Sequence, residues 1–483
     1  MQDAVYDVVI RNAAVLDGTG APAIHADVAI LGNRIAQIGA IDAARARREI
    51  DARGLTLTPG FIDVHAHDDA ALISRPDMKP KLTQGVTTVI AGNCGISAAP
   101  YSRRGNPSGL LRLVFKSERF MSDTFEDYLS KVREAAPTIN AAFLTGHSTL
   151  RAQVMGDDLH RTANSSEVAE MRDLLTGCLE QGSLGLSTGL FYPCARAAST
   201  HEVIEIAKPL QSCGGIYVTH MRDESDHVIQ SIHESLEIGR EVGVPLIISH
   251  HKCMGQRNFG RSTETLTLLS RASLHQPVAF DVYPYTAGSS VLNEELASLA
   301  SKTVISWCDP HPEYVGRDLG EVARELGQPL TSTIARLLPA GGIYFFMDEA
   351  DVVRIMQSSS GMIGSDGMPD DQRPHPRLWG TFPRVLGRYV REQKALSLQD
   401  AVHRMTGLPA RRFGLKERGT IEVGNFADLC VFDANSIADC ATFEQPTRPA
   451  IGVCYVFVNG QLALADGIPT NARAGSVLMR QGG

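Results

Sequence analysis

Side chains of the types that bind metal ions follow several short apolar segments of the chain, each at the point where its segment ends. Imidazole, thiolate and carboxylate groups are the ligands that zinc takes in proteins. Their equivalent placement predicts that the ends of these segments meet at one metal site. With the segment that each follows, they are His65 and His67 (61–64), Cys94 (86–90), His220 (216–219), His250 (246–249) and Asp366 (362–365).

His65 and His67 form the first pair of candidate ligands. Residues two apart on an extended segment point to the same side, so both imidazoles face one site. Alone, the pattern also fits two exposed or capping histidines. Combined with a thiol and two further histidines at other segment ends, it favours zinc, a borderline-soft metal that accepts nitrogen and sulfur ligands.

Cys94 has three interpretations. It can be a nucleophile, which needs a nearby histidine and an oxyanion hole, a thiolate ligand deprotonated by zinc, or a packed core residue. We favour the ligand because four histidines are available and neither a lysine nor a carboxylate ends the same segment. The other eight cysteines are scattered without a C-x-x-C pair, as expected for reduced, buried thiols rather than disulfides or a zinc ribbon.

Asp366 is the candidate acid and base. An aspartate followed by glycine, as here, also suits a turn or a helix N-cap. Beside zinc, however, its carboxylate can take a proton from water, whose pKa the metal lowers, and pass it to a leaving nitrogen. Residues 185–189 match the G-x-S-x-G string of serine hydrolases, but a loop-like sequence follows them where that nucleophile requires a helix.

Eight apolar segments could position these side chains. Helical stretches such as 165–180 and 227–242 separate the short apolar runs, which indicates β/α units and a parallel sheet. Eight such strands close a (β/α)8 TIM-like barrel of the α/β class, with the active site at the carboxyl ends of the strands. The predicted strands are residues 61–64, 86–90, 141–144, 184–187, 216–219, 246–249, 279–283 and 362–365.

Both ends of the chain are rich in short β-type runs, and each end is too small for a core of its own. We expect residues 1–58 and 416–483 to pack together as one small β-sandwich domain, with the catalytic barrel in 59–415. The gap between the seventh and eighth strands is the longest. We expect residues 284–345 within it to form an insertion over the barrel mouth.

The composition is that of a globular protein, because 43% hydrophobic and 21% charged residues in 483 leave no room for long disorder. Lys and Arg total 46 against 54 Asp and Glu, a net charge of −8, which argues against a nucleic-acid partner. The N-terminus lacks a secretory pattern, and no apolar span of about 20 residues occurs. We expect a cytoplasmic protein without a membrane partner; the oligomeric state stays open, a monomer included.

Several motifs carry a family resemblance. Residues 59–67 (PGFIDVHAH), with Gly364-Ser365-Asp366 and the C-terminal β motif at 424–433, resemble the amidohydrolase superfamily, whose members are metal-dependent hydrolases built on a (β/α)8 barrel with a small β domain. A closer resemblance, from about residue 5 to about residue 475, is to the D-aminoacylase (N-acyl-D-amino-acid deacylase) branch. Its motifs are at 92–95, 146–151, 219–224, 249–252 and 373–380.

The resemblance implies a role for each candidate ligand. Cys94, His220 and His250 would hold a tightly bound zinc ion. A second, weaker site would use His65 and His67 and share Cys94. Many relatives bridge two metals with a carboxylated lysine, whereas the third strand here ends in glycine and histidine, as in this branch. Asp366 would be the general base and acid.

The same resemblance implies a set of groups that bind the α-carboxylate of a substrate: Arg377, Lys252, Tyr283, Tyr192 and Ser289. Arg377 suits this best because its planar fork pairs with a carboxylate through two hydrogen bonds. Either tyrosine can instead be a packing residue, and Ser289 can instead cap a turn.

The sequence therefore predicts zinc-dependent hydrolysis of small N-acyl-D-amino acids to a carboxylate and a free D-amino acid. Alternatives are a deacylase specific for N-acyl-D-glutamate or N-acyl-D-aspartate, a cyclic-amide hydrolase of the hydantoinase or dihydropyrimidinase type, a hydrolase with a cysteine nucleophile, and a non-catalytic relative. The preference for the amino-acid side chain is not readable from the sequence, because loops of unknown geometry, within 284–345, decide it.

Overall fold

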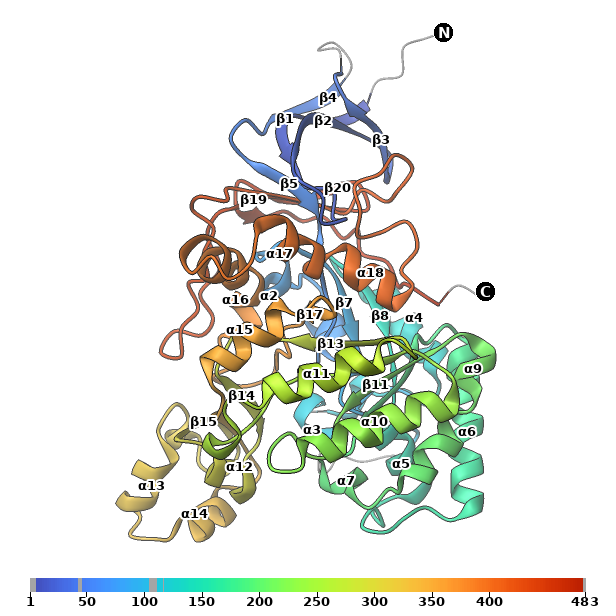
Figure 1. The fold of residues 1–483 in the computed structure, drawn as a ribbon, viewed down its shortest axis with the longest axis vertical. Coiled ribbons are helices and arrows are strands. Elements are labelled where there is room, and N and C mark those ends of the chain that lie inside the picture. The colour runs from blue at the N-terminus through green and yellow to red at the C-terminus, as the bar shows by residue number, and fades with distance from the viewer. Residues whose placement is uncertain (1–5, 42–45, 104–110, 116, 481–483) are drawn as a thin grey trace.

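The computed structural model describes residues 6–41, 46–103, 111–115 and 117–480. A small β unit, built from both ends of the chain, lies at one end of a larger body of alternating strands and helices (Figure 1). The three-stranded insertion projects from the opposite end of that body. Among the described residues, no helix combines the length and the apolar character needed to cross a membrane.

Eight parallel strands, the third of them formed by two consecutive segments, close the barrel, which confirms the predicted fold class. These strands are almost wholly buried, as expected when helices cover a parallel sheet. The first and last strands meet through a bridge between Ala66 and Gly367 and a hydrogen bond from Asp366 N to His65 O (2.8 Å). In barrel order the strands are β6 (Phe61–Asp63), β7 (Val86–Ala91), β8 (Asn140–Phe143) continued by β9 (Thr145–Gly146), β10 (Gly185–Gly189), β11 (Ile216–His220), β12 (Leu246–Ile248), β13 (Val278–Val282) and β17 (Gly361–Ile363).

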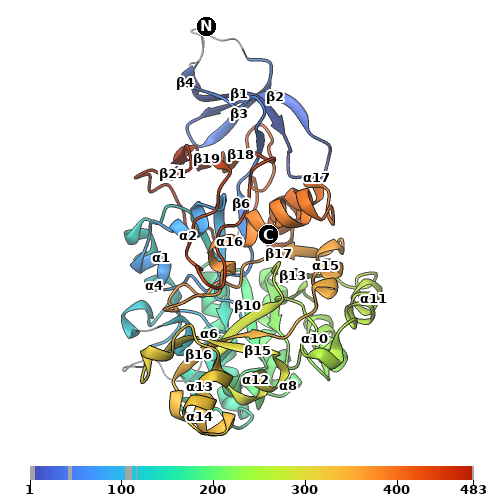
Figure 2. The ribbon, with the colours of Figure 1, turned by 90° about the vertical axis from the view of Figure 1, so that its left-hand side faces the viewer.

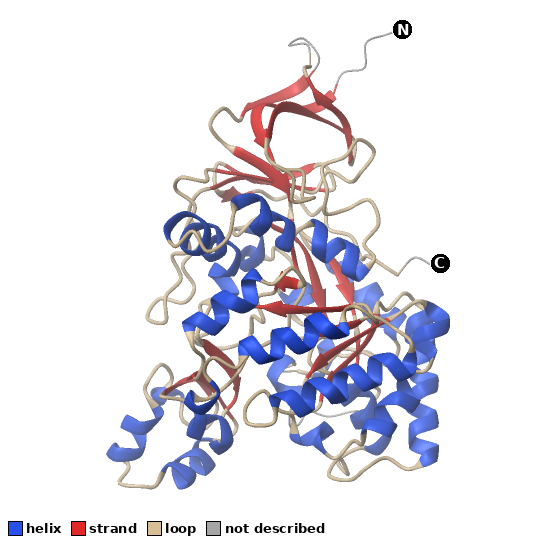
Figure 3. Cartoon of the chain, viewed as in Figure 1, coloured by secondary structure: helices blue, strands red, loops and turns tan. Residues whose placement is uncertain are grey.

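Helices surround the barrel, and local sequence sets their ends (Figure 3). Asn164 and Glu167 form a capping box that starts α6 (Ser165–Glu180), and Gly243 ends α10 (Val228–Val242) in a left-handed conformation. The other helices are α1 (Ala71–Ser74), α2 (Lys79–Leu82), α3 (Leu111–Val114), α4 (Phe125–Ala135), α5 (His147–Met155), α7 (Pro193–Arg196), α8 (Thr200–Ala207), α9 (Pro209–Cys213), α11 (Ser262–Ala272), α15 (Glu349–Gln357), α16 (Arg377–Arg384), α17 (Leu398–Met405) and α18 (Gly407–Phe413).

Strands from both termini join into one nine-stranded sheet around a shared apolar core. The junction is the antiparallel pairing of β5 with β18, in which Pro59 lies opposite Leu429. This sheet places the start of β6, and therefore the first histidine pair, at a fixed position. Its strands are β1 (Tyr6–Val15), β2 (Ile24–Leu31), β3 (Arg34–Gly39), β4 (Ala46–Asp51), β5 (Thr56–Pro59), β18 (Leu429–Phe432), β19 (Val453–Val458), β20 (Gln461–Ala465) and β21 (Ile468–Pro469).

The insertion follows β13 and precedes β17, as predicted. It is a three-stranded antiparallel sheet with helices on it, seen in yellow in Figure 2. The middle strand of this sheet, β16, pairs with β14 and β15. Its elements are β14 (Ala287–Val291), α12 (Glu294–Leu299), β15 (Lys302–Cys308), α13 (Leu319–Glu325), α14 (Leu330–Leu337) and β16 (Ala340–Phe345).

Candidate metal centre and active site

The predicted metal-binding side chains converge at the carboxyl ends of the barrel strands. The Cys94 Sγ lies 3.2 Å from His65 Nε2 and 3.4 Å from His250 Nε2. The Asp366 Oδ1 lies 3.2 Å from His67 Nε2. All of these side chains are buried. Residues from four different strands thus form one cluster.

His220 completes the cluster from the end of β11. Its ring centroid is 4.4 Å from that of His250, and its Nε2 is 3.5 Å from a Glu224 oxygen. Both nitrogens of this buried ring lack a hydrogen bond in the part of the chain that the structure describes. Zinc binds imidazole and carboxylate ligands, so this buried ring beside Glu224 and His250 fits a zinc ligand set.

Three residues of the cluster have left-handed backbone. The φ angles are 54° at Cys94, 37° at His250 and 50° at Asp366. Non-glycine residues rarely adopt this region, and such residues concentrate at functional sites. The sharp turn after each strand directs the side chain over the end of the barrel rather than along the strand.

Two acidic residues that the sequence reasoning missed orient the histidines. Asp281 Oδ2 lies 3.2 Å from His65 Nδ1, and its other oxygen accepts a hydrogen bond from His250 N (2.9 Å). Glu224 Oε1 lies 3.1 Å from His250 Nδ1. Carboxylates that hold the second nitrogen of a metal-binding histidine are typical of zinc sites. A charged residue inside the apolar strand β13 was the available signal for Asp281.

The Cys94 thiol favours its ionised form. Burial alone raises the pKa of Cys94, but the neighbouring His65 and His250 outweigh it and hold that pKa well below its usual value. A thiolate is the form in which cysteine binds metals and the form that attacks as a nucleophile. The site thus provides an anionic sulfur between two imidazoles.

Asp366 is likewise held as an anion. Burial raises its pKa, whereas the Arg377 guanidinium and His65 lower it well below its usual value. Arg377 Nη1 lies 2.9 Å from Asp366 Oδ2, and its side chain is fully buried. A carboxylate in this state can accept a proton.

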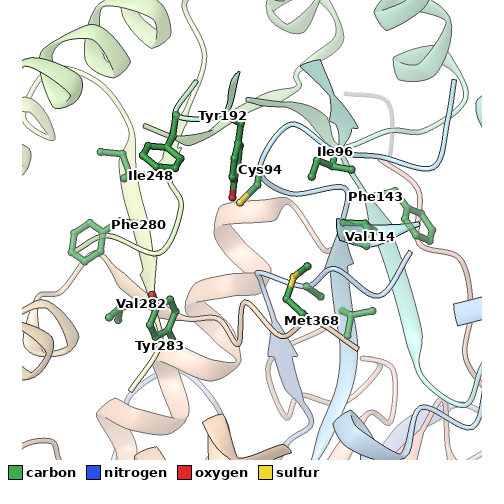
Figure 4. Packing of buried hydrophobic residues seen from close by; sticks show 14 of the residues in the cluster. Cys94, Ile96, Val114, Phe143, Tyr192, Ile248, Phe280, Val282, Tyr283 and Met368 are labelled. Atoms are coloured by element: carbon green, nitrogen blue, oxygen red, sulfur yellow. The ribbon is translucent and has the colours of Figure 1, made fainter. Parts of the chain in front are cut away.

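The predicted substrate-binding side chains surround the cluster. The Arg377 guanidinium lies 4.5 Å from the ring centroid of Tyr283, and its Nη2 donates to the backbone oxygen of Ser289 at 3.5 Å. Tyr192 packs against His220 and directs its hydroxyl toward Cys94 (Figure 4). Lys252 is in the same pocket, but its ammonium is 2.7 Å from Glu224 Oε2, so its charge is already paired.

The serine of the G-x-S-x-G string is not exposed. Ser187 is buried on β10, where its hydroxyl donates to the backbone oxygen of Gly92 and accepts from Gly95 N (3.0 Å). This hydroxyl therefore holds the turn before and after Cys94. That structural role agrees with the interpretation that residues 185–189 match the serine-hydrolase string only by chance.

The chain matches the model of the amidohydrolase family over residues 48–259 and 333–463. It is 50% identical over 475 residues to the D-aminoacylase of Alcaligenes xylosoxydans xylosoxydans, covering 98% of each chain. A crystal structure of D-aminoacylase superposes with a TM-score of 0.96 at 50% identity, covering 98% of this chain and 100% of the other. The N-acyl-D-glutamate deacylase of Bordetella bronchiseptica, solved with zinc and a phosphonate mimic of the tetrahedral intermediate, gives 0.94 at 42% identity, with coverages of 98% and 100%.

The matches to the D-aminoacylase and to the two solved structures span the barrel, the terminal sheet and the insertion, and they agree with the metal-binding residue types at the strand ends. The chain therefore belongs to the amidohydrolase family and, within it, to the D-aminoacylase branch.

Proposed function

We propose that this protein is a zinc-dependent deacylase that hydrolyses N-acyl-D-amino acids to a carboxylate and a free D-amino acid. The observation that carries the proposal is the placement of the Asp366 carboxylate, held by Arg377, beside the buried cluster of Cys94 and histidines. The solved relative with zinc and a mimic of the tetrahedral intermediate supports the same chemistry.

In this proposal Cys94, His220 and His250 hold the tightly bound zinc ion, and His65 and His67 form a second, weaker site that shares Cys94. Glu224 and Asp281 fix the orientation of the rings. The zinc ion, when bound, acts as a Lewis acid that polarises the acyl carbonyl and lowers the pKa of water.

Asp366 moves the proton. Its carboxylate accepts a proton from the attacking water and later donates it to the leaving nitrogen, as one group acting first as base and then as acid. Arg377 and His65 keep it ionised before the reaction.

We propose Arg377 as the main partner of the substrate α-carboxylate, supported by Lys252, Tyr283, Tyr192 and Ser289. The planar guanidinium matches a carboxylate with two hydrogen bonds. Tyr283 covers one face of this guanidinium, which fixes its plane. Lys252 lies beside Glu224 and His250, and because Glu224 balances its charge we assign it a supporting role only.

The pocket favours apolar amino-acid side chains over those of D-aspartate and D-glutamate. Its walls include Met254, Leu296 and Phe346. Lys252 lines this pocket and is paired with Glu224, and Arg377, which is paired with Asp366, is assigned to the α-carboxylate. A second carboxylate on the substrate would be buried without a free cation, which is unfavourable.

We further propose the domain boundaries predicted above, with residues 1–58 and 416–483 forming the β domain, 59–415 the barrel and 284–345 the insertion. A cytoplasmic location is supported by the nine cysteines, all of which are free thiols.

The test is hydrolysis by the zinc-loaded protein of N-acetyl-D-leucine, N-acetyl-D-glutamate, N-acetyl-D-aspartate, N-acetyl-L-leucine and a hydantoin, side by side. We expect the highest kcat/KM for N-acetyl-D-leucine. A higher value for the hydantoin would support a cyclic-amide hydrolase instead. Chelation should abolish the activity and added zinc should restore it; an activity that resists chelation but is lost on thiol alkylation would indicate a cysteine nucleophile.

A further inference from the structure

A large chamber lies next to the proposed catalytic pocket. Its volume is about 700 Å³, within the range of pockets that hold small organic ligands. One side is the segment from Phe191 to Cys194, which follows β10 and starts α7. The facing side comes from the insertion, through Val291 at the end of β14, Trp307 on β15 and Leu338 after α14.

The chamber and the catalytic pocket share part of their walls. Phe191, Tyr192 and Ser290 line both. Tyr192 and Ser290 therefore lie at the boundary between the two spaces. A ligand in the catalytic pocket needs only to pass this pair to enter the chamber.

The expected orientation of the substrate directs its acyl group toward the chamber. The α-carboxylate lies at Arg377, against the ring of Tyr283, which follows β13. Phe191 and Tyr192 pack instead on His220, on the side that follows β10, and Figure 4 shows the two tyrosines approaching from different sides. With the carbonyl between these sides, the acyl chain continues past Phe191 and the ring of Tyr192, while the Tyr192 hydroxyl, directed toward Cys94, stays with the polar groups of the substrate.

The walls of the chamber suit an uncharged chain. Leu159, Phe191, Val291, Trp307 and Leu338 contribute apolar surface, and Leu338 is 43% exposed. The two arginines that line the chamber are in ion pairs, Arg196 with Glu295 and Arg112 with Asp309. Neither is free to hold an anionic group.

We propose that this chamber, the space between the segment 191–194 and the insertion, binds the acyl chain of N-acyl-D-amino acids and makes medium-length fatty-acyl derivatives better substrates than acetyl derivatives. The proposal rests on the proposed function. Burial of one methylene is worth up to about fourfold in kcat/KM. We expect a gain of about tenfold or more from N-acetyl- to N-decanoyl-D-leucine, because part of an eight-methylene extension stays in contact with water.

The test compares N-acetyl-, N-hexanoyl- and N-decanoyl-D-leucine with the wild-type protein and three variants. Leu338→Asp places a charge on the apolar wall, and Val291→Trp takes up space in the chamber. Leu274→Asp is the matched control, because that leucine is 78% exposed and lies outside the chamber. We expect the first two variants to lose most of the gain with chain length while hydrolysis of the acetyl substrate changes less than about twofold, and the control to keep the gain.

A kcat/KM that stays flat or falls with chain length, with the acetyl substrate still hydrolysed, would overturn the proposal and leave the proposed function intact. A gain that follows the size of the D-side chain, tested with N-acetyl-D-tryptophan, would assign the chamber to that side chain and equally overturn it. Equal losses for all three acyl groups in both chamber variants would also contradict it. Failure to hydrolyse any N-acyl-D-amino acid would refute the proposed function itself.

Discussion

Lys81 is the residue whose replacement tests most directly how the barrel supports its active site. Its ammonium group is fully buried, 2.7 Å from Asp63 Oδ2, 3.2 Å from Asp68 Oδ2 and 2.8 Å from Ser365 Oγ. Asp63 in turn accepts hydrogen bonds from Ser365 N (2.8 Å) and His65 N (3.3 Å). Lys81 therefore joins the end of β6 to the end of β17, and these two strand ends directly precede His65 and Asp366.

Lys81→Met removes the cation and leaves two buried carboxylates without a counter-charge. Breaking a buried pair in this way costs about 3 to 5 kcal/mol. Lys79 is the matched control, because it lies on the same helix and pairs with Asp77 at 3.2 Å, but with its side chain 57% exposed. An exposed pair contributes about 0 to 1 kcal/mol, so Lys79→Met should have almost no effect.

The assay is urea unfolding followed by tryptophan fluorescence, at one fixed zinc concentration because a bound ion shifts the apparent stability. Adding Asp63→Asn to Lys81→Met removes one of the unpaired charges, so the double variant should be more stable than the sum of the single losses predicts. A loss below about 1 kcal/mol for Lys81→Met, equal to that of Lys79→Met, would refute the reasoning.

Three further predictions concern the proposed catalytic and metal-binding groups and one distant ion pair. Asp366→Asn should lower kcat by about 10² to 10⁴ while zinc content, measured by elemental analysis, stays near wild type; a near-normal kcat would exclude the acid and base role. Cys94→Ala should lose zinc and activity together, and tight zinc binding by this variant would contradict the ligand assignment. Burial raises the pKa of Glu202, but His147 and Arg151 outweigh it and hold that pKa at about 2, against 4.5 when unperturbed. The stability that the Glu202 carboxylate contributes is fully present above about pH 4.5 and is lost as the pH falls toward 2. In acid-unfolding curves the wild type should therefore lose more stability than Glu202→Gln over this range. Parallel curves for the two proteins would contradict the pairing of Glu202 with His147 and Arg151.

The sequence was sufficient to predict the barrel and most of the cluster because both depend on local signals. Each buried strand is a short apolar run, and a change from apolar to polar residues marks where the strand ends, as at His220, the last residue of β11. In a parallel barrel all such ends lie on one face, so the candidate ligands could be grouped without knowledge of any long-range contact.

The supporting residues could not be predicted in this way because their partners are far apart along the chain. Asp281 contacts His65 across 216 positions, and Lys81 contacts Ser365 across 284. Asp281 stands out as a charged residue in an apolar strand, but neither it nor Lys81 carries a local sign of which residue it contacts. The ion pair between Lys252 and Glu224 could not be predicted for the same reason, because the sequence indicates a cation but not which carboxylate balances its charge.

The left-handed residues show why these hidden contacts matter for function. Such backbone costs about 1 to 3 kcal/mol at each residue and persists only when the surroundings enforce it. At His250 the enforcing contact is its own N–H bound to Asp281, and at Asp366 it is the N–H bound to the backbone of His65. Asp281 also holds the ring of His65. The same carboxylate thus fixes a ligand side chain and the strained turn of another ligand, so the cluster keeps its shape through the protein's own hydrogen bonds.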